Sequence, residues 1–166
     1  MIDSYSNTSQ EVVAGGNISF AINSIQTGCT ATHSAGSTTF SLNKPGFYFI
    51  TFNGTGAITG ATAGTIIVSM LNNGTLVPGA TASVSSASTT DVRSLAFSKL
   101  IQVKPSCCAV NNTTNLTFNN AGLAATFTNV NVVITKIAYG GTIMVKFKAL
   151  YKGMNDDLKD AEMMID

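Results

Sequence analysis

The sequence has few charged residues, and those that it has are dispersed. Charged side chains make up 10% of the 166 residues, and the net charge is +1, without a basic cluster. The sequence therefore lacks the cluster of Lys and Arg side chains that binds the phosphates of a nucleic acid. No apolar run reaches the length of about 18 residues that a membrane-spanning helix needs. Gly, Ser, Thr, Asn and Ala are abundant instead, which favours short strands and polar turns over long helices.

Residue types that carry out acid–base or nucleophilic catalysis are scarce as well. The chain has one histidine, His33, and its only acidic residues before residue 140 are Asp3, Glu11 and Asp91. A Ser-His-Asp arrangement would need His33 and Asp91, and no nucleophile-elbow motif is present. We therefore expect a protein that is not an enzyme, with no catalytic residue and no cofactor.

Cysteine is limited to Cys29, Cys107 and Cys108. Adjacent cysteines form only a strained disulfide, and a bridge from Cys29 to either of them leaves one thiol over, so reduced thiols are expected. Cys29 and His33 have the spacing of half a zinc site. Because adjacent cysteines are poor tetrahedral chelators, no metal site is expected, and Asp91 without an acidic loop gives little support for calcium.

The first part of the chain is polar. Residues 1–16 end in Gly15-Gly16 and are predicted to form a loose arm, followed by a strand over residues 17–25. The opening residues lack the basic and apolar regions of a signal peptide. Either a signal has been removed, or the protein leaves its cell by another route, such as lysis.

The stretch around Pro45-Gly46 gives the clearest prediction of local structure in the sequence. Strands are expected over residues 38–43 and 47–53, on either side of a turn at Pro45-Gly46. The second strand carries large apolar side chains on both faces: Tyr48, Ile50 and Phe52 on one, and Phe47 and Phe49 with Thr51 on the other. Since an antiparallel sheet usually keeps one face wet, such a strand has to be covered twice. A second copy of the chain is the simplest second cover.

Further alternating segments predict strands over residues 65–71, 92–103, about 116–118 and 126–137. Asn73-Gly74 predicts a tight hairpin turn, because both residues tolerate positive φ. Residues 54–64 are rich in glycine and residues 78–90 in Ser, Thr, Ala and Gly, so both are expected as exposed loops, the second with at most a short edge strand. The pattern predicts an all-β jelly-roll sandwich of about 8 to 10 antiparallel strands.

Several of these residues carry a resemblance to a known superfamily. Phe40, Leu42, Pro45-Gly46, Tyr48 and Phe52-Asn53-Gly54-Thr55 resemble the strand pair of the tumour-necrosis-factor and complement-head jelly rolls. The closing segment Phe-Thr-Asn-Val-Asn-Val-Val-Ile-Thr-Lys-Ile is similar to the last strand of complement-head-like domains of bacterial viruses and spore coats. The Gly-, Ala-, Thr- and Asn-rich loops also resemble those microbial members.

The resemblance implies a jelly-roll domain over residues 17–137 that forms trimers. Many members of the superfamily are trimers with the central strand on the threefold axis, which implies that Tyr48, Ile50 and Phe52 are core. The implied trimer interface consists of Phe47, Phe49, Thr51, Val133 and Ile137.

The composition changes after Gly140-Gly141. Four of the six methionines and five of the eight acidic residues lie beyond this point. Residues 138–166 are predicted to form a tail of one strand and one short helix, with Asn155 as the helix N-cap. The tail is a possible anchor to a particle through its apolar residues Ile143, Val145, Phe147, Leu158, Ala161 and Ile165.

The function expected from this reading is that of a structural homotrimer on a bacteriophage virion. It would be a capsid (head) decoration or head fibre, or the tip of a host-attachment fibre, and its partners would be itself and virion capsid or tail proteins. A host-surface glycan or protein is a further candidate partner for the exposed loops. The alternatives are a bacterial spore-coat or cell-surface protein and a secreted receptor-binding ligand of the same superfamily. A secreted ligand would normally carry a signal peptide or a collagen-like stalk.

Overall fold

The computed structural model describes residues 1–105 and 113–138, and this part of the chain consists of strands, turns and loops. It contains no helix, and therefore none that could cross a membrane. The strands are β1 (Ile2–Ser6), β2 (Gln10–Val12), β3 (Ile22–Gln26), β4 (Ala31–His33), β5 (Thr39–Leu42), β6 (Gly46–Ile58), β7 (Gly64–Asn72), β8 (Thr75–Ser86), β9 (Arg93–Val103), β10 (Thr114–Asn120) and β11 (Ala125–Ala138).

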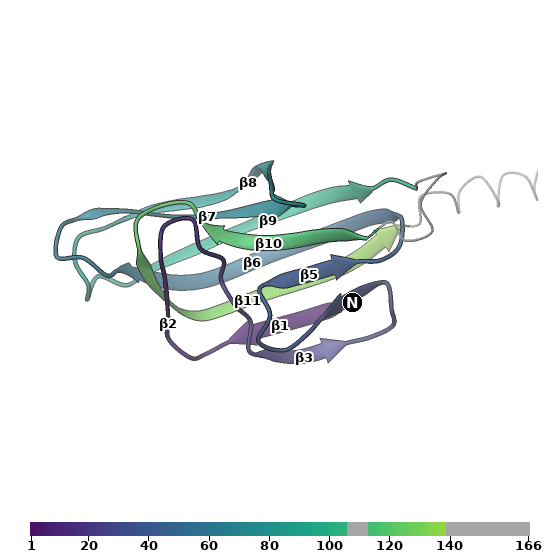
Figure 1. Ribbon diagram of the computed structural model, residues 1–166, viewed down its shortest axis with the longest axis horizontal. Helices are drawn as coiled ribbons and strands as arrows, with labels where there is room; N and C mark the ends of the chain where they lie inside the picture. Colours follow the sequence, from purple (N-terminus) through teal and green to yellow (C-terminus); the bar gives the residue numbers. More distant parts are fainter. Residues whose placement is uncertain (106–112, 139–166) are drawn as a thin grey trace, which may run out of the picture.

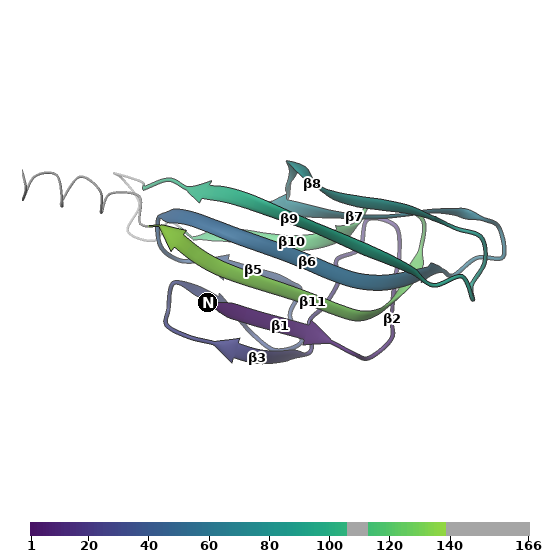
Figure 2. The same cartoon turned by 180° about the vertical axis from the view of Figure 1, so that it is seen from behind.

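The strands form two antiparallel sheets packed face to face (Figures 1 and 2). Sheet A has six strands in the order β3-β1-β11-β6-β9, with β2 paired to the first part of β11. Sheet B has five strands in the order β4-β5-β10-β7-β8. The all-β jelly-roll sandwich predicted from the sequence is confirmed. It has more strands than expected because two of them lie in the first 16 residues.

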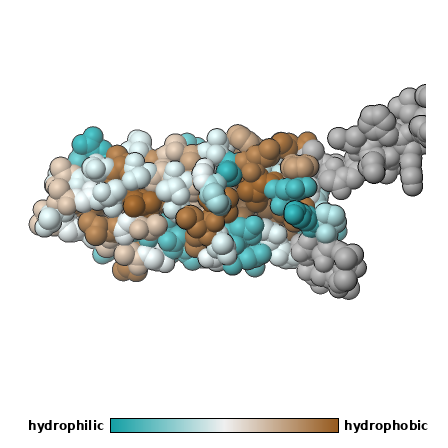
Figure 3. All heavy atoms as spheres, turned by 90° about the horizontal axis from the view of Figure 1, so that it is seen from above, coloured by the Kyte–Doolittle hydropathy of each residue, from teal (hydrophilic) through white to brown (hydrophobic). Residues whose placement is uncertain are grey.

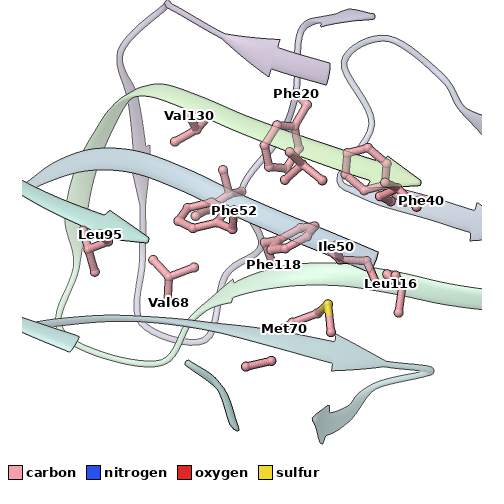
Figure 4. Packing of buried hydrophobic residues seen from close by; sticks show 14 of the residues in the cluster. Phe20, Phe40, Ile50, Phe52, Val68, Met70, Leu95, Leu116, Phe118 and Val130 are labelled. Carbon is pink, nitrogen blue, oxygen red and sulfur yellow. The ribbon is translucent and has the colours of Figure 1, made fainter. Parts of the chain in front are cut away.

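Aromatic rings fill the space between the sheets (Figure 4). The ring of Phe52, from β6, stacks on Phe118, from β10, at a centroid distance of 5.4 Å, and on Phe97, from β9, at 5.3 Å. Phe40 meets Phe118 edge to face at 5.8 Å. Each fully buried side chain of this size contributes roughly 1.5 to 3 kcal/mol, so this cluster is a main source of stability.

Strand β6 lies between β11 and β9 in sheet A. The side chains of Tyr48, Ile50 and Phe52 are fully buried in the core, as the resemblance implied. The side chain of Phe49 points to the opposite face and is 41% exposed. A strand with apolar residues on both faces is therefore present, and one of those faces lies on the surface of the described chain.

The N-terminal arm predicted for residues 1–16 is wrong. Strand β1 lies inside sheet A, between β11 and β3. Its core-facing residues are Ile2, Ser4 and Ser6, and the two serines hide the strand from a hydrophobic pattern. The Ser4 hydroxyl is satisfied in the core because it donates to Asn23 Oδ1 at 2.6 Å.

The strand predicted over residues 17–25 is only partly correct. Ile18 and Phe20 are fully buried, but they belong to an extended segment before β3, and Ile18 N donates to the Phe118 carbonyl at 2.8 Å. The regular strand begins only at Ile22, whose side chain is 45% exposed.

The glycine-rich segment 54–64 is mostly strand, which corrects the predicted loop. Strand β6 continues to Ile58, and only residues 59–63 connect it to β7. A Cβ at Gly54 would lie 2.9 Å from Val130 Cγ1, and one at Gly56 would lie 3.2 Å from Phe127 Cδ1. These glycines make room for side chains of β11, and they do not mark a turn.

The loop predicted over residues 78–90 is also wrong for most of its length. Strand β8 runs to Ser86 as the edge strand of sheet B, a position where Pro78 is tolerated because it donates no ladder hydrogen bond. Ala80 and Ser86 are buried, so small residues build part of the core wall here. Only residues 87–92 remain as a loop.

The hairpin turn at Asn73-Gly74 is confirmed. Both residues have positive φ, 48° for Asn73 and 79° for Gly74, as a type I′ turn requires. The turn joins β7 to β8 in sheet B. The predicted strand-helix tail over residues 138–166 lies outside the described residues, apart from Ala138 at the end of β11, as do Cys107 and Cys108.

Gly122 provides a test of the packing between the β10–β11 turn and β7. A Cβ at Gly122 would lie 2.5 Å from the Thr65 carbonyl oxygen and 2.6 Å from Ile67 N, and these are backbone atoms that cannot move independently. We expect Gly122→Ala to lower the free energy of unfolding by about 1 to 3 kcal/mol. Urea denaturation measures this change. Gly60→Ala is the matched control, because no atom lies within 4 Å of its Cβ position. Equal urea midpoints for the two variants would contradict the expectation.

Candidate interaction surface

The outer face of sheet A carries the largest group of exposed apolar side chains. Its centre is Phe49 on β6, with Leu100 opposite it on β9 and Thr135 opposite it on β11. Leu100 is 50% exposed. Ile137, at the β-bulge near the end of β11, is 57% exposed. We call this surface the outer face, and its exposed large apolar residues are Ile22, Ile25, Phe49, Leu100 and Ile137.

The structure brings together most of the residues predicted for the trimer interface. Thr51 pairs directly with Val133 across β6 and β11, so these two side chains are neighbours on the face that bears Phe49. Phe47 lies one step further along β6, opposite Ala138, and is partly buried. Ile137 is separated from this row by the bulge between Lys136 and Ala138. The trimer contact itself stays a prediction.

Three apolar members of the outer face were missed by the sequence reading. Leu100 follows the alternation of β9 but was overlooked because its neighbour Ile101 takes the core position. Ile22 and Ile25 reach this face through β3, which pairs with β1 and places them opposite Tyr5 and Asp3. Since β1 was predicted as an arm, this extension of the face was not expected.

Asp3 is the carboxylate that lies among the apolar side chains of the outer face, and it is hydrogen-bonded within the chain. Glu11, on β2, is exposed on the same side of the sheet, beside the first part of β11. Asp3 Oδ1 accepts a hydrogen bond of 2.6 Å from Asn131 Nδ2. Its Oδ2 accepts one of 2.7 Å from the Ser24 hydroxyl. A carboxylate with both oxygens bonded costs less to bury than a free one, so Asp3 is compatible with a covered surface.

His33, which was weighed above for a zinc site and for a catalytic arrangement, makes its contacts inside the fold. Its imidazole is buried, with Nε2 3.1 Å from the Ser37 carbonyl oxygen and Nδ1 2.7 Å from Asn23 Oδ1. Its ring stacks on Phe40 at 4.2 Å. Cys29 is exposed, and the described residues contain no cluster of metal-ligating side chains.

The Asp91 carboxylate contacts nearby residues of its own loop and β9, and it does not pair with His33. Its Oδ2 accepts a hydrogen bond of 2.7 Å from Ala87 N, which lowers the pKa of the Asp91 carboxyl, and the Arg93 guanidinium adds to the shift. Arg93 Nε lies 2.8 Å from Asp91 Oδ1. These contacts stabilise the loop 87–92.

Two open recesses flank the loop 87–92 at the far end of the sandwich from Ala138. One, of about 350 Å³, is lined by Glu11 and several threonines beside Val92. The other, of about 370 Å³, lies between the start of β7, the end of β8 and the Asp91–Arg93 pair. Both are recesses in which hydroxyl groups are frequent.

Comparisons with known proteins support the fold. Neither a protein-family model nor a curated protein sequence matches the chain. Its structure is similar to that of Eiger TNF from S. frugiperda, with a TM-score of 0.57 and 11% identity over 84% of this chain and 94% of that chain. Murine APRIL at pH 8.5 gives a TM-score of 0.55 and 9% identity over 82% and 97% of the two chains. The PRD1 vertex protein P5 gives a TM-score of 0.47 and 18% identity over 82% and 95%. The similarity to Eiger TNF and murine APRIL shows that the chain has the same jelly-roll fold as these two proteins.

The buried His33 predicts a pH-dependent stability. Burial lowers the pKa of its imidazole, and the hydrogen bond to Ser37 opposes part of this shift. The unfolded chain therefore takes up a proton near pH 6.5, before the folded chain does. Stability is fully present above that pH and decreases as the pH falls toward the folded-state pKa.

Thermal unfolding between about pH 7.5 and pH 5 measures this loss, a range chosen because carboxyl groups titrate mainly below it. We expect the melting temperature of the natural chain to fall across the range more steeply than that of a His33→Gln variant. Parallel pH profiles for the two proteins would show that His33 is not the titrating group.

Proposed function

We propose that the protein is a non-enzymatic structural homotrimer that belongs to a bacteriophage virion, as a head decoration, a head fibre or the tip of a host-attachment fibre. The observation that carries the proposal is the outer face of sheet A, where Phe49, Leu100 and Ile137 are exposed together. No other part of the described chain covers this face. Contiguous exposed apolar surface of this kind is typical of protein–protein interfaces.

Threefold symmetry requires two different patches, because each chain contacts its neighbour in a head-to-tail manner. The second patch that the structure offers is the side formed by β8 and β9, the end strands of the two sheets. Val77, Val84 and Phe97 are only partly buried there and pack against the core. Seen from this side, hydrophobic side chains gather mainly in the right half of the coloured surface (Figure 3). This side of one chain can pack on the outer face of the next.

The assignment to a virion is supported by the resemblance of the loops and of the closing strand to microbial complement-head-like domains. The sparse charge and the many Gly, Thr and Asn residues suit a passive structural surface better than a nucleic-acid-binding one. An antibody raised against the protein should label purified phage particles from the source culture. Labelling of spores or of the cell surface instead would favour the spore-coat or surface alternative.

Substitution of Phe49 tests the trimer. We expect the natural chain to be a trimer by light scattering at micromolar concentration, and Phe49→Glu to shift it to a folded monomer, because each of the three interfaces would bury an unpaired carboxylate. Leu123→Glu is the matched control, since Leu123 is 51% exposed and lies in the turn between β10 and β11, outside both proposed patches. A natural chain that scatters as a monomer would falsify the interface.

We also propose that the tail, predicted from the sequence over residues 138–166, anchors the trimer to its particle. The support is the change of composition after Gly140-Gly141, and the apolar residues already given from Ile143 to Ile165. The chain reaches this segment from β11, whose last pairs lie at the end of the sandwich where β6 begins.

A chain that ends at Gly140 tests the anchor. We expect it to remain a soluble trimer by light scattering but to be absent from particles assembled with it in place of the full chain. Aggregation of the shortened chain, or loss of its trimer, would show that the tail belongs to the domain, and its incorporation into particles would rule out an anchor.

A further inference from the structure

The loop 87–92 has a fixed shape that extends beyond the regular sandwich. The buried Ser86 hydroxyl lies 3.1 Å from the Ser88 carbonyl oxygen and 2.9 Å from that of Asp91, so it closes the loop from inside. Asp91 Oδ2 closes it again from outside by accepting from Ala87 N. A recognition surface held in one shape loses little conformational entropy on binding.

The Asp91–Arg93 pair on this loop presents fixed donors and acceptors to solvent. Arg93 Nε lies 2.8 Å from Asp91 Oδ1 and Nη2 lies 3.0 Å from Oδ2, so the contact is bidentate. A guanidinium has five N–H donors, and this pair uses only two of them. The Arg93 side chain is 50% exposed and that of Asp91 is 22% exposed, so further partners can reach both groups.

An open recess of about 370 Å³ adjoins the pair. It lies where β7 begins and β8 ends, and Thr65 and Ser85 face each other there across the two strands. Its lining combines hydroxyl groups and small apolar surfaces with the ion pair: Ala63, Gly64, Thr65, Ser85, Ser86, Ala87, Asp91 and Arg93.

The chemistry of this lining selects one class of ligand. Since the ion pair is neutral as a unit, a free anion gains little there and would face the Asp91 carboxylate. The lining contains no aromatic ring on which a planar base could stack. A sugar fits better, because one hydroxyl of a neighbouring pair accepts from the guanidinium while the other donates to the carboxylate. The methyl groups of Ala63 and Ala87 offer apolar contact to the C–H face of the ring.

We propose that this recess is a saccharide-binding site in which Arg93 and Asp91 hold two neighbouring hydroxyl groups. This deepens the proposed function by naming the class of host-surface partner, and it rests on that function only for the biological source of the sugar. The recess is formed within one chain, so binding does not require a trimer.

Titration of the full chain, labelled with ¹⁵N, tests the site by NMR. The probes are the methyl glycosides of glucose, galactose, mannose and N-acetylglucosamine at millimolar concentration, with acetate and phosphate as anion controls. We expect at least one glycoside to shift the amide signals of Ser85, Ala87 and Arg93, and a deoxy analogue that lacks one hydroxyl of the pair to bind more weakly. Stronger shifts with acetate or phosphate than with every glycoside would overturn the assignment to a sugar.

Two variants separate binding from the structural role of the ion pair. Arg93→Lys keeps the charge but loses the planar fork, and we expect about a tenfold or greater loss of affinity, which corresponds to one charge-assisted hydrogen bond. Thr90→Ala is the matched control on the same loop, because Thr90 does not line the recess. Both variants should melt at the temperature of the natural chain.

The outcomes distinguish this proposal from that of the trimer. Shifts that map elsewhere, or that persist unchanged in Arg93→Lys, would overturn the site, as would the lack of any shift with all four glycosides. Light scattering on the same samples reports assembly independently. A trimer that binds no glycoside leaves the proposed assembly standing, and a monomer that binds one leaves the site standing.

Discussion

The stack of Phe52 on Phe118 and Phe97 is the contact on which the rest of the sandwich depends. It joins β6 of sheet A to β10 in the middle of sheet B, and it includes a ring from β9, the edge strand beside β6. Because β6 alternates from Gly46 to Gly56, placing Phe52 in this stack fixes Tyr48 and Ile50 in the core and turns Phe49 outward. A slip of one residue would expose the first set and bury the second. The core and the outer face are therefore two consequences of one register.

Alternating sequence predicted the strands that have one clearly apolar face. β5, β7 and β11 are of this kind. The turn at Asn73-Gly74 was predicted because it requires two residues that tolerate positive φ. β1 and β8 were not predicted, because serine and alanine occupy many of their inward positions and do not produce an alternation of large hydrophobic residues. The segment 54–64 misled for a related reason. Gly54 and Gly56 look like loop residues, but they are small because Val130 and Phe127 occupy the adjacent space.

Of the candidate interface, the sequence predicted only the residues on β6 and β11. The alternation of side chains along a strand places Phe47, Phe49 and Thr51 on one face of β6. The same alternation groups Val133 with the outward residues of β11. Membership of Leu100, Ile22 and Ile25 depends on which strands lie beside this pair, and such pairing is a property of the tertiary fold. The recess beside Arg93 was even less accessible, because it exists only where the ends of β7 and β8 meet the loop 87–92.

The charges of the outer face bear on whether it is built to be covered. A face intended for water has no need to pair its carboxylates, whereas a face that becomes buried must satisfy each of them beforehand. Asp3 is the acidic residue among the apolar side chains of this face, and both of its oxygens accept hydrogen bonds from within the chain, one from Asn131 and one from Ser24. It lies beside Ile25 and Val133, so any partner that covers those side chains also covers Asp3. Since its hydrogen bonds come from its own chain, a partner needs no cation at this position and can be the apolar side formed by β8 and β9 of a second copy of the chain.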